Sequence, residues 1–269
     1  PKMEIEFGYE LVFEFPQPTP LVLMLEVHSS RIPDLLIQDQ IVTDPFTPIS
    51  VYQDNYGNSC SRLVAPKGEF RLSTRARIKD SGEPDIVVPF AHQQDIESLP
   101  FESLIYLLPS RYCDTELMLD AAWQKFENAP LGWARVQTIC DFVHQHLNYD
   151  FETASPTKTA SQALDEGAGV CRDYAHLAIS LCRCMNIPAR YCCGYMLHED
   201  GPDVPHEPEF AAWFEALLDG QWYTFDARFN EPRKGRILIS RGRDAADVPI
   251  MHAFGFSTIS SFDVWAKEA

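Results

Sequence analysis

The first hundred residues alternate between apolar and polar positions with the short period of β-strands. "IEFGYELVFEF" alternates, "PLVLMLEV" is a continuous apolar run typical of a strand buried on both faces, and "EFRLSTRARI" alternates again. Gly and Asn in "DNYGNSCSRLV" predict a turn between two such strands. Short strands separated by turn residues predict an antiparallel β-sandwich over residues 1–104.

After about residue 105 the pattern lengthens to the period of helices. A helix is predicted from Asp114 or Thr115 to about Phe126, because Asp and Thr are favoured N-caps. "PLGWARVQTICDFVHQHLNYD" carries an apolar stripe, and "AHLAISLCRCM" is apolar nearly all round, which indicates a helix in the interior of its domain. The sequence therefore predicts a second domain, of α+β type, over residues 105–269.

A β-hairpin is predicted in "FAAWFEALLDGQWYTFDAR", where an Asp-Gly pair joins two aromatic-rich runs. If the loop contains only those two residues, strand pairing places Trp213 opposite Asp226 and Ala211 opposite Arg228. Strand alternation then puts all four residues on one face, where diagonal neighbours can touch. A side chain at position 211 would thus lie beside Asp226.

The charge of the chain argues against two classes of partner. It has 39 acidic and 22 basic residues, which give a net charge of −17 and a pI near 4.8. Nucleic acids and anionic membranes both require clustered Lys and Arg, so we expect neither as a partner. No apolar run approaches the ~20 residues that span a bilayer, and "PKMEIEFGYE" has no signal-peptide pattern.

Eight cysteines raise the question of disulfides or a metal site. Disulfide frameworks are typical of small secreted scaffolds, and this chain is long and rich in apolar residues, so we expect reduced thiols and a cytoplasmic location. The C-x-C at Cys182 and the pair at Cys192 do not match the C-x2-C spacing of structural zinc sites. We expect no metal and no organic cofactor.

Cys171 differs from the other cysteines because it stands where "DEGAGV" gives way to a helix. Backbone N–H groups and the positive end of the helix dipole favour a thiolate there. The alternative is a small buried core residue, which is the interpretation that fits Cys140, Cys182 and Cys184. Position alone leaves both interpretations open for Cys171.

Three blocks of the sequence resemble the bacterial transglutaminase-like superfamily of cysteine proteases. "GVCRDYAHLAISLCRCMNIPARYCCGY" resembles its cysteine box, "FAAWFEALLDGQWYTFDARFN" resembles the block that carries the other two triad residues, and the N-terminal half resembles its β-rich region. The resemblance implies a papain-like α+β core with a Cys-His-Asp triad. It places the nucleophile at Cys171 and the acid at Asp226, but Ala211 stands where the histidine is expected.

Three interpretations of the missing histidine remain open. His206 or His198, in the loop before the hairpin, could supply the base; alternatively, the helix N-terminus and Arg228 could stabilise the thiolate without an imidazole. In the third, the domain binds without turnover, and Asp226 and Arg228 form a structural ion pair. His176 is predicted to be a hydrogen-bonded core residue that points away from the sulfur.

The leading functional prediction is thiol-dependent acyl chemistry on amide bonds, most simply hydrolysis of a peptide or protein substrate. Cys171 would be the nucleophile, with Asp226 and His206 as further catalytic residues. Arg228 and Trp213 are the predicted substrate-binding residues, since an aromatic ring can line a cleft. The alternative is a catalytically silent transglutaminase-like module that binds peptide or protein in the same cleft.

Overall fold

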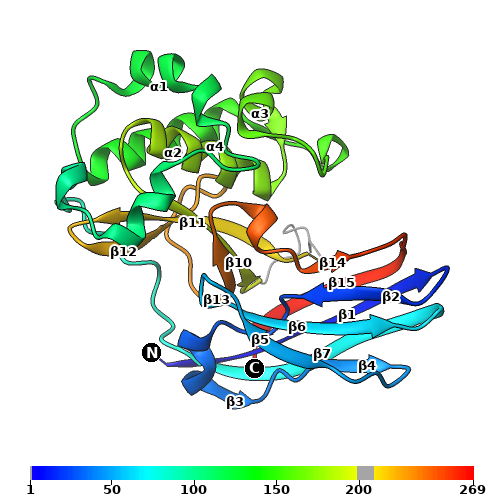
Figure 1. Cartoon of the computed structure of the whole chain (residues 1–269). Coiled ribbons are helices and arrows are strands. Elements are labelled where there is room, and N and C mark those ends of the chain that lie inside the picture. Colours follow the sequence, from blue (N-terminus) through cyan, green and yellow to red (C-terminus); the bar gives the residue numbers. More distant parts are fainter. Residues whose placement is uncertain (1, 199–208) are drawn as a thin grey trace.

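The N-terminal half forms a β-sandwich in the computed structural model, which describes residues 2–198 and 209–269 (Figure 1). The first sheet contains β1 (Met3–Phe15), β3 (Leu35–Ile37), β4 (Val42–Asp44), β7 (Gly68–Asp80) and β15 (Thr258–Glu268). The second contains β2 (Thr19–Leu23), β5 (Ser50–Gln53), β6 (Ser59–Ala65) and β14 (Met251–Ala253). Their orders are β15-β1-β7-β3, with β4 also paired to β7, and β14-β2-β6-β5.

The alternation in the sequence explains which side chains enter this sandwich. Along β7, every second residue from Phe70 to Ile78 is buried, while the residues between them are at least partly exposed. The buried set packs against apolar residues of β1 and β2, including Phe7 and Leu21. The predicted antiparallel sandwich is confirmed by these two sheets.

The C-terminal segment also belongs to the sandwich. Strand β15 pairs with β1 along nearly its whole length, from Ile5 opposite Glu268 to Glu14 opposite Thr258, and β14 pairs with β2. The sequence predicts that all of residues 105–269 belong to the second domain, and the structure differs there. Pairing between strands some 250 residues apart leaves no trace in a local hydrophobic pattern, so the return of the chain was not predictable.

The second half is built round one antiparallel sheet of order β12-β11-β10-β13. Its strands are β10 (Ala189–Met196), β11 (Ala211–Leu218), β12 (Gln221–Phe225) and β13 (Arg236–Gly242). The helices α1 (Leu119–Phe126), α2 (Trp133–His146), α3 (Ala160–Glu166) and α4 (Cys171–Cys184) lie together on one side of this sheet (Figure 1). A short parallel pair is formed by β8 (Asn148–Tyr149) and β9 (Ala168–Gly169).

Short 3-10 turns connect these elements. They are η1 (Ser29–Asp34), η2 (Ile96–Ser98), η3 (Phe101–Leu107), η4 (Thr115–Leu117), η5 (Phe151–Thr153) and η6 (Ala245–Asp247). The helix expected from Asp114 or Thr115 thus begins as η4 and becomes α-helical at Leu119. No helix in the described part of the chain has the length and apolar character that crossing a membrane requires.

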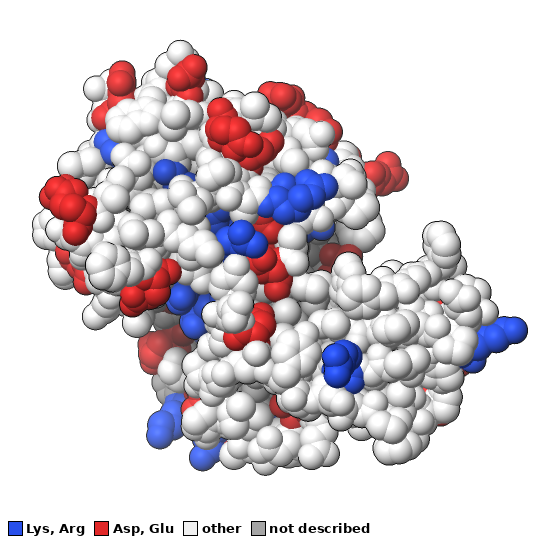
Figure 2. All heavy atoms as spheres, viewed as in Figure 1, with Lys and Arg blue, Asp and Glu red and all other residues white. Residues whose placement is uncertain are grey.

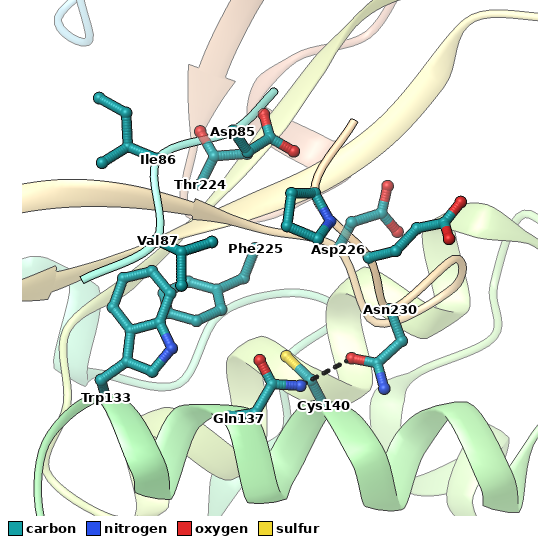
Figure 3. Close-up of a pocket in the computed structure, with 12 residues that line it drawn as sticks. Asp85, Ile86, Val87, Trp133, Gln137, Cys140, Thr224, Phe225, Asp226 and Asn230 are labelled. Atoms are coloured by element: carbon teal, nitrogen blue, oxygen red, sulfur yellow. Dashed lines mark hydrogen bonds between the residues drawn. The ribbon is translucent and has the colours of Figure 1, made fainter. Parts of the chain in front are cut away.

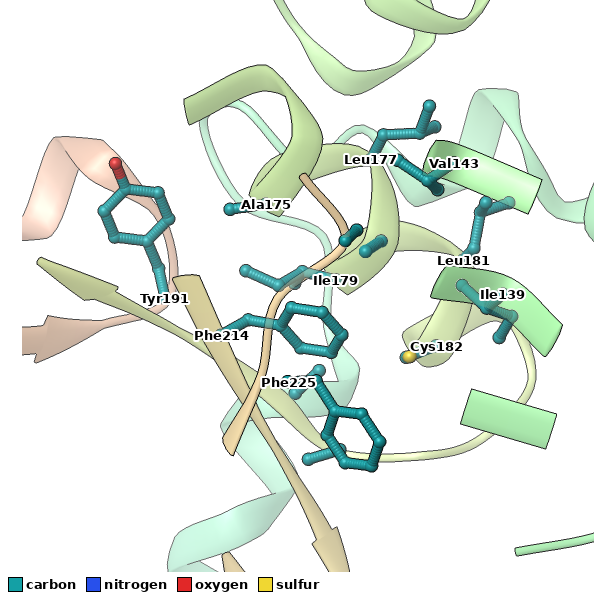
Figure 4. Close-up of a cluster of buried hydrophobic side chains, with 14 of the residues drawn as sticks. Ile139, Val143, Ala175, Leu177, Ile179, Leu181, Cys182, Tyr191, Phe214 and Phe225 are labelled. Atoms are coloured by element: carbon teal, nitrogen blue, oxygen red, sulfur yellow. The ribbon is translucent and has the colours of Figure 1, made fainter. Parts of the chain in front are cut away.

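Helix α4 is the centre of the second half, as its apolar sequence predicts. Leu177, Ile179 and Cys182 are fully buried between the other helices and the sheet (Figure 4). The helix is followed by Asn186, which adopts a left-handed conformation with φ of 64°. The chain then enters β10, so the helix packs directly on the strand that follows it.

The Asp-Gly hairpin has the predicted two-residue loop, with Leu218 paired to Gln221, but its ladder is shorter than expected. Pairing between β11 and β12 ends at Phe214 opposite Phe225. Beyond it the chain turns, because the Asp226 carboxylate accepts hydrogen bonds from backbone N–H groups two and three residues further on. The predicted pairs of Trp213 with Asp226 and of Ala211 with Arg228 are therefore not formed.

Candidate active site

Cys171 is the first residue of α4 and is partly exposed. The turn before it is fixed by Asp173, whose Oδ2 accepts the N–H of Val170 at 2.9 Å. Gly169 is required here, since a Cβ at that position would lie 2.5 Å from the Cβ of Asp173. The N-terminus of α4 thus presents its positive dipole end to the thiol, which favours a thiolate.

The thiol opens on a cleft of about 840 Å3, which we call the Cys171 cleft. One wall comes from β10 and β11, and the others come from the loops around η5 and η6 and from β14 and β15. Its lining includes Tyr112, Phe151, Cys171, Arg172, Tyr191, Cys193, Phe210, Ala211, Ala212, Ile250, His252 and Phe262. A cleft of this size, with apolar walls and a few polar groups, is typical of a ligand site.

The other seven cysteines are buried, and no disulfide joins any of the eight. Burial raises the pKa of Cys193 to about 12 and that of Cys184 to about 11. These thiols keep their protons at neutral pH. Cys171 is therefore the cysteine whose position suits nucleophilic chemistry.

His176 is a core residue, as predicted. Its Nε2 accepts the N–H of Ala245 at 3.1 Å, and its ring stacks between Tyr112 and Tyr191 at centroid distances of 5.1 and 5.0 Å. Burial, reinforced by Arg172 and Arg183, lowers the pKa of His176 well below its usual value. The imidazole is therefore neutral and is fully enclosed under the floor of the cleft.

Among the residues that the structure describes, Asp226 lies in an ion-pair network rather than beside an imidazole. Its Oδ2 accepts two hydrogen bonds from the guanidinium of Arg236, both at 3.2 Å, and Oδ1 accepts from backbone N–H groups. Arg236 also pairs with Asp85 at 2.9 Å. The Asp226 and Arg236 side chains are only 3% and 8% exposed. A small cavity of about 50 Å3 beside them is lined by Trp133, Cys140 and their neighbours (Figure 3).

Ala211 and Trp213 lie on the face of the sheet opposite α4. Ala211 pairs with Gly194 of β10, and Trp213 packs with Cys192 in a small cluster. Trp213 is 3% exposed and does not line the Cys171 cleft. Its predicted role in substrate binding stays a prediction, and its burial argues against direct contact. On the other face, Ala212 stands opposite Cys193 and both line the cleft.

Arg228 lies beside the strand pair that leads into Cys171. Its guanidinium carbon is 3.8 Å from the ring centroid of Tyr149, and Tyr149 pairs with Gly169, two residues before Cys171. The structure thus brings Arg228 near the start of α4, though not by the strand register that the sequence suggested. His206 lies outside the described residues.

His252, on β14, is a further candidate that the sequence analysis did not identify. It is the histidine that lines the Cys171 cleft among the residues the structure describes. Strand β14 reaches the cleft only because the C-terminal segment returns to the sandwich. Local sequence around His252 contains no signal of that return.

Comparison with known proteins agrees with this geometry. Residues 120–227 match the family model of the Transglutaminase-like superfamily. The uncharacterized protein ML0607 of Mycobacterium leprae is 24% identical over 254 residues, which cover 92% of this chain and 90% of that protein. The chain superimposes, with a TM-score of 0.83 and 27% identity, on a crystal structure described as a "Putative Cysteine Protease" from Cytophaga hutchinsonii. The match covers 100% of this chain and 91% of the Cytophaga chain. Residues 120–227 therefore form a transglutaminase-like domain.

Proposed function

We propose that this protein carries out thiol-dependent acyl chemistry on amide bonds, most simply peptide hydrolysis, with Cys171 as the nucleophile. The observation that carries the proposal is the place of Cys171, at the N-terminus of a buried helix and open to a cleft of about 840 Å3. The fold shared with the Cytophaga protein supports the same reaction class by analogy.

The proposed reaction has two steps. The Cys171 sulfur attacks the carbonyl carbon, the C–N bond breaks, and the amine leaves with a proton, so that a thioester remains on the protein. Water then hydrolyses the thioester and restores the thiol. The N–H of Cys171 at the helix start can donate to the oxyanion formed in each step.

Tyr191 is a second donor that the cleft offers. It lines the Cys171 cleft, and burial, reinforced by Cys193 and Cys171, raises its pKa well above the usual value. A phenol that keeps its proton at neutral pH can donate a hydrogen bond to negative charge that develops near the sulfur.

We propose that a histidine outside position 211 accepts the proton. His206 is the candidate from the sequence, and His252 is the candidate from the cleft lining. Hydrolysis of p-nitrophenyl acetate and of a casein peptide mixture tests the proposal, with Cys171→Ser as the inactive control. Loss of turnover in His206→Ala but not in His252→Ala would assign the base to the loop, and the reverse would assign it to β14.

A binding module without turnover is the second candidate, and one observation favours it. Asp226, the acid of the implied triad, is held inside the protein by Arg236, which also pairs with Asp85. An acid engaged in this way can stabilise the fold without any part in proton transfer. A parent protein that binds peptides but has the same ester and peptide turnover as Cys171→Ser would establish this second function.

A further inference from the structure

Two arginines meet at one end of the Cys171 cleft. The guanidinium carbon of Arg111 lies 4.7 Å from the ring centroid of Tyr112, and that of Arg172 lies 5.0 Å from the same centroid. Arg172 directly follows the nucleophile, and all three residues line the cleft. Both guanidinium groups therefore lie within about 5 Å of one aromatic ring, in the cleft that Cys171 also lines.

Tyr112 is held firmly in place beneath them. Its backbone N–H donates to Asp244 at 2.7 Å, its hydroxyl donates to the Pro156 carbonyl at 2.6 Å, and its ring stacks on His176. Because His176 is neutral, it adds no third positive charge under the ring. The arginines thus lie against a rigid aromatic platform, which limits the entropy that they lose when they bind a ligand.

Neither arginine is neutralised by a carboxylate of the described chain. Arg111 forms no ion pair or hydrogen bond there, and Arg172 donates to the Ser155 carbonyl while its Nε is buried without a partner. By contrast, Arg190, Arg236 and Arg241 are each paired with a carboxylate. Two arginines of one cleft that form no ion pair with a described carboxylate are unusual in a chain with a net charge of −17.

Two acidic groups of the described chain lie nearby. Glu209 is the described carboxylate in the cleft lining, against two arginines. Asp173 is buried, caps the turn before α4 and interacts electrostatically with Arg172, although the two side chains form no ion pair. Figure 2 shows acidic side chains over much of this face of the helical half, and groups of Lys and Arg atoms toward the junction with the sandwich with acidic atoms beside them.

We propose that Arg111 and Arg172 form an anion subsite that binds a carboxylate of a peptide close to the amide bond presented to Cys171. Guanidinium groups bind carboxylates with paired, charge-assisted hydrogen bonds, and an incoming anion relieves the repulsion between the two arginines. The apolar wall of Phe210, Ile250 and Phe262 accommodates the rest of the peptide. The preferred ligand is thus an acidic peptide, which extends the proposed function by naming its substrate class.

The test compares two alkylating agents of nearly equal size, iodoacetate and iodoacetamide, at Cys171. In both reagents the same thiolate displaces iodide and forms a C–S bond. The ratio of the two rates therefore reports the charge preference of the cleft without any need for turnover. We expect the iodoacetate-to-iodoacetamide ratio to fall roughly three- to fivefold in Arg111→Gln. It should fall further when Arg172→Gln is added, and raised KCl should lower the ratio of the parent toward that of the variant.

Arg75→Gln is the matched control, because Arg75 is also exposed and lies over an aromatic ring, that of Trp265 on the sandwich. An equal ratio in parent and Arg111→Gln, or an equal fall in Arg75→Gln, would overturn the subsite. If the parent shows no turnover but the iodoacetate-to-iodoacetamide ratio still falls in Arg111→Gln, hydrolysis is rejected and the subsite stands.

Short peptides then identify the source of the carboxylate. Acetyl-Ala-Glu-Ala-amide is compared with its Gln analogue, and acetyl-Ala-Ala-Ala with a free terminus is compared with its amide, each as a protectant of Cys171 against iodoacetamide. Stronger protection by either acidic member supports the proposal and assigns a side-chain or a terminal carboxylate. Equal protection within both pairs contradicts it.

Discussion

The two ends of the implied triad have different surroundings in this protein. Cys171 lies at a helix start and opens on a large cleft, whereas Asp226 is enclosed in a buried network with Arg236 and Asp85. The nucleophile end is accessible and the acid end is engaged in structural contacts. Position 211 is an alanine, so it supplies no imidazole that could link the acid to the Cys171 sulfur.

The largest expected effect is the difference in alkylation rate between Cys171 and the buried cysteines. We expect Cys171 to react with iodoacetamide at neutral pH at least about a thousandfold faster than Cys193 or Cys182, because burial raises the pKa of both other thiols. Peptide mapping by mass spectrometry after brief treatment measures the order. Faster labelling of Cys182 or Cys193 would remove the distinction between cleft and core.

A substitution in the ion-pair network of Asp226 should change the stability of the protein rather than the reactivity of Cys171. Arg236→Met leaves Asp226 and Asp85 buried without their partner, so we expect a loss of about 3 kcal/mol in the free energy of unfolding. Arg71→Met, which breaks an exposed ion pair with Glu10, is the control and should cost less than about 1 kcal/mol. Urea unfolding measures both, and equal small losses would show that the network does not matter for stability.

The neutral His176 beneath the cleft predicts a pH dependence of stability. The unfolded imidazole takes up a proton below about pH 6.5, and the folded one does not, since its pKa is lowered. This group therefore makes the protein less stable as the pH falls from 7 to 5, by up to about 1.4 kcal/mol per pH unit. His176→Gln should show a shallower dependence in urea unfolding, and an unchanged slope would mean that His176 is protonated in the folded state.

The smallest expected effect comes from restoring the histidine. Ala211→His adds an imidazole to the cleft lining on the face that carries Trp213. We expect the pH of half-maximal alkylation of Cys171 to fall by less than about one unit, because a thiolate and an imidazolium stabilise each other. Ala212→His, one residue along and on the opposite face, is the matched comparison. An unchanged midpoint in a folded Ala211→His variant would show that position 211 does not reach the thiol.

Local structure was predictable because it depends on neighbouring residues. The alternation in β7, the apolar α4 and the Asp-Gly loop of the hairpin all follow from side-chain periodicity and turn chemistry. The place of Cys171 at the start of α4 was predictable for the same reason. These features agree between sequence and structure.

The surroundings of the site were not predictable, because they depend on contacts between distant segments. Arg236, which holds Asp226, lies on β13, and Asp85, which also pairs with Arg236, lies on the loop after β7. His252 reaches the cleft on β14, and Tyr112 lies over His176 from a loop that precedes α1. No periodicity in the sequence reports such pairings.

Trapping of an acyl-protein intermediate tests directly whether Cys171 is the nucleophile. The parent, Cys171→Ser and Cys171→Ala are each incubated with a peptide thioester, quenched in acid and examined by intact-mass and peptide-map mass spectrometry. We expect one acyl group on Cys171 in the parent and none at that position in Cys171→Ala. An acyl group on another cysteine, or equal acylation of parent and Cys171→Ala, would contradict Cys171 as the nucleophile.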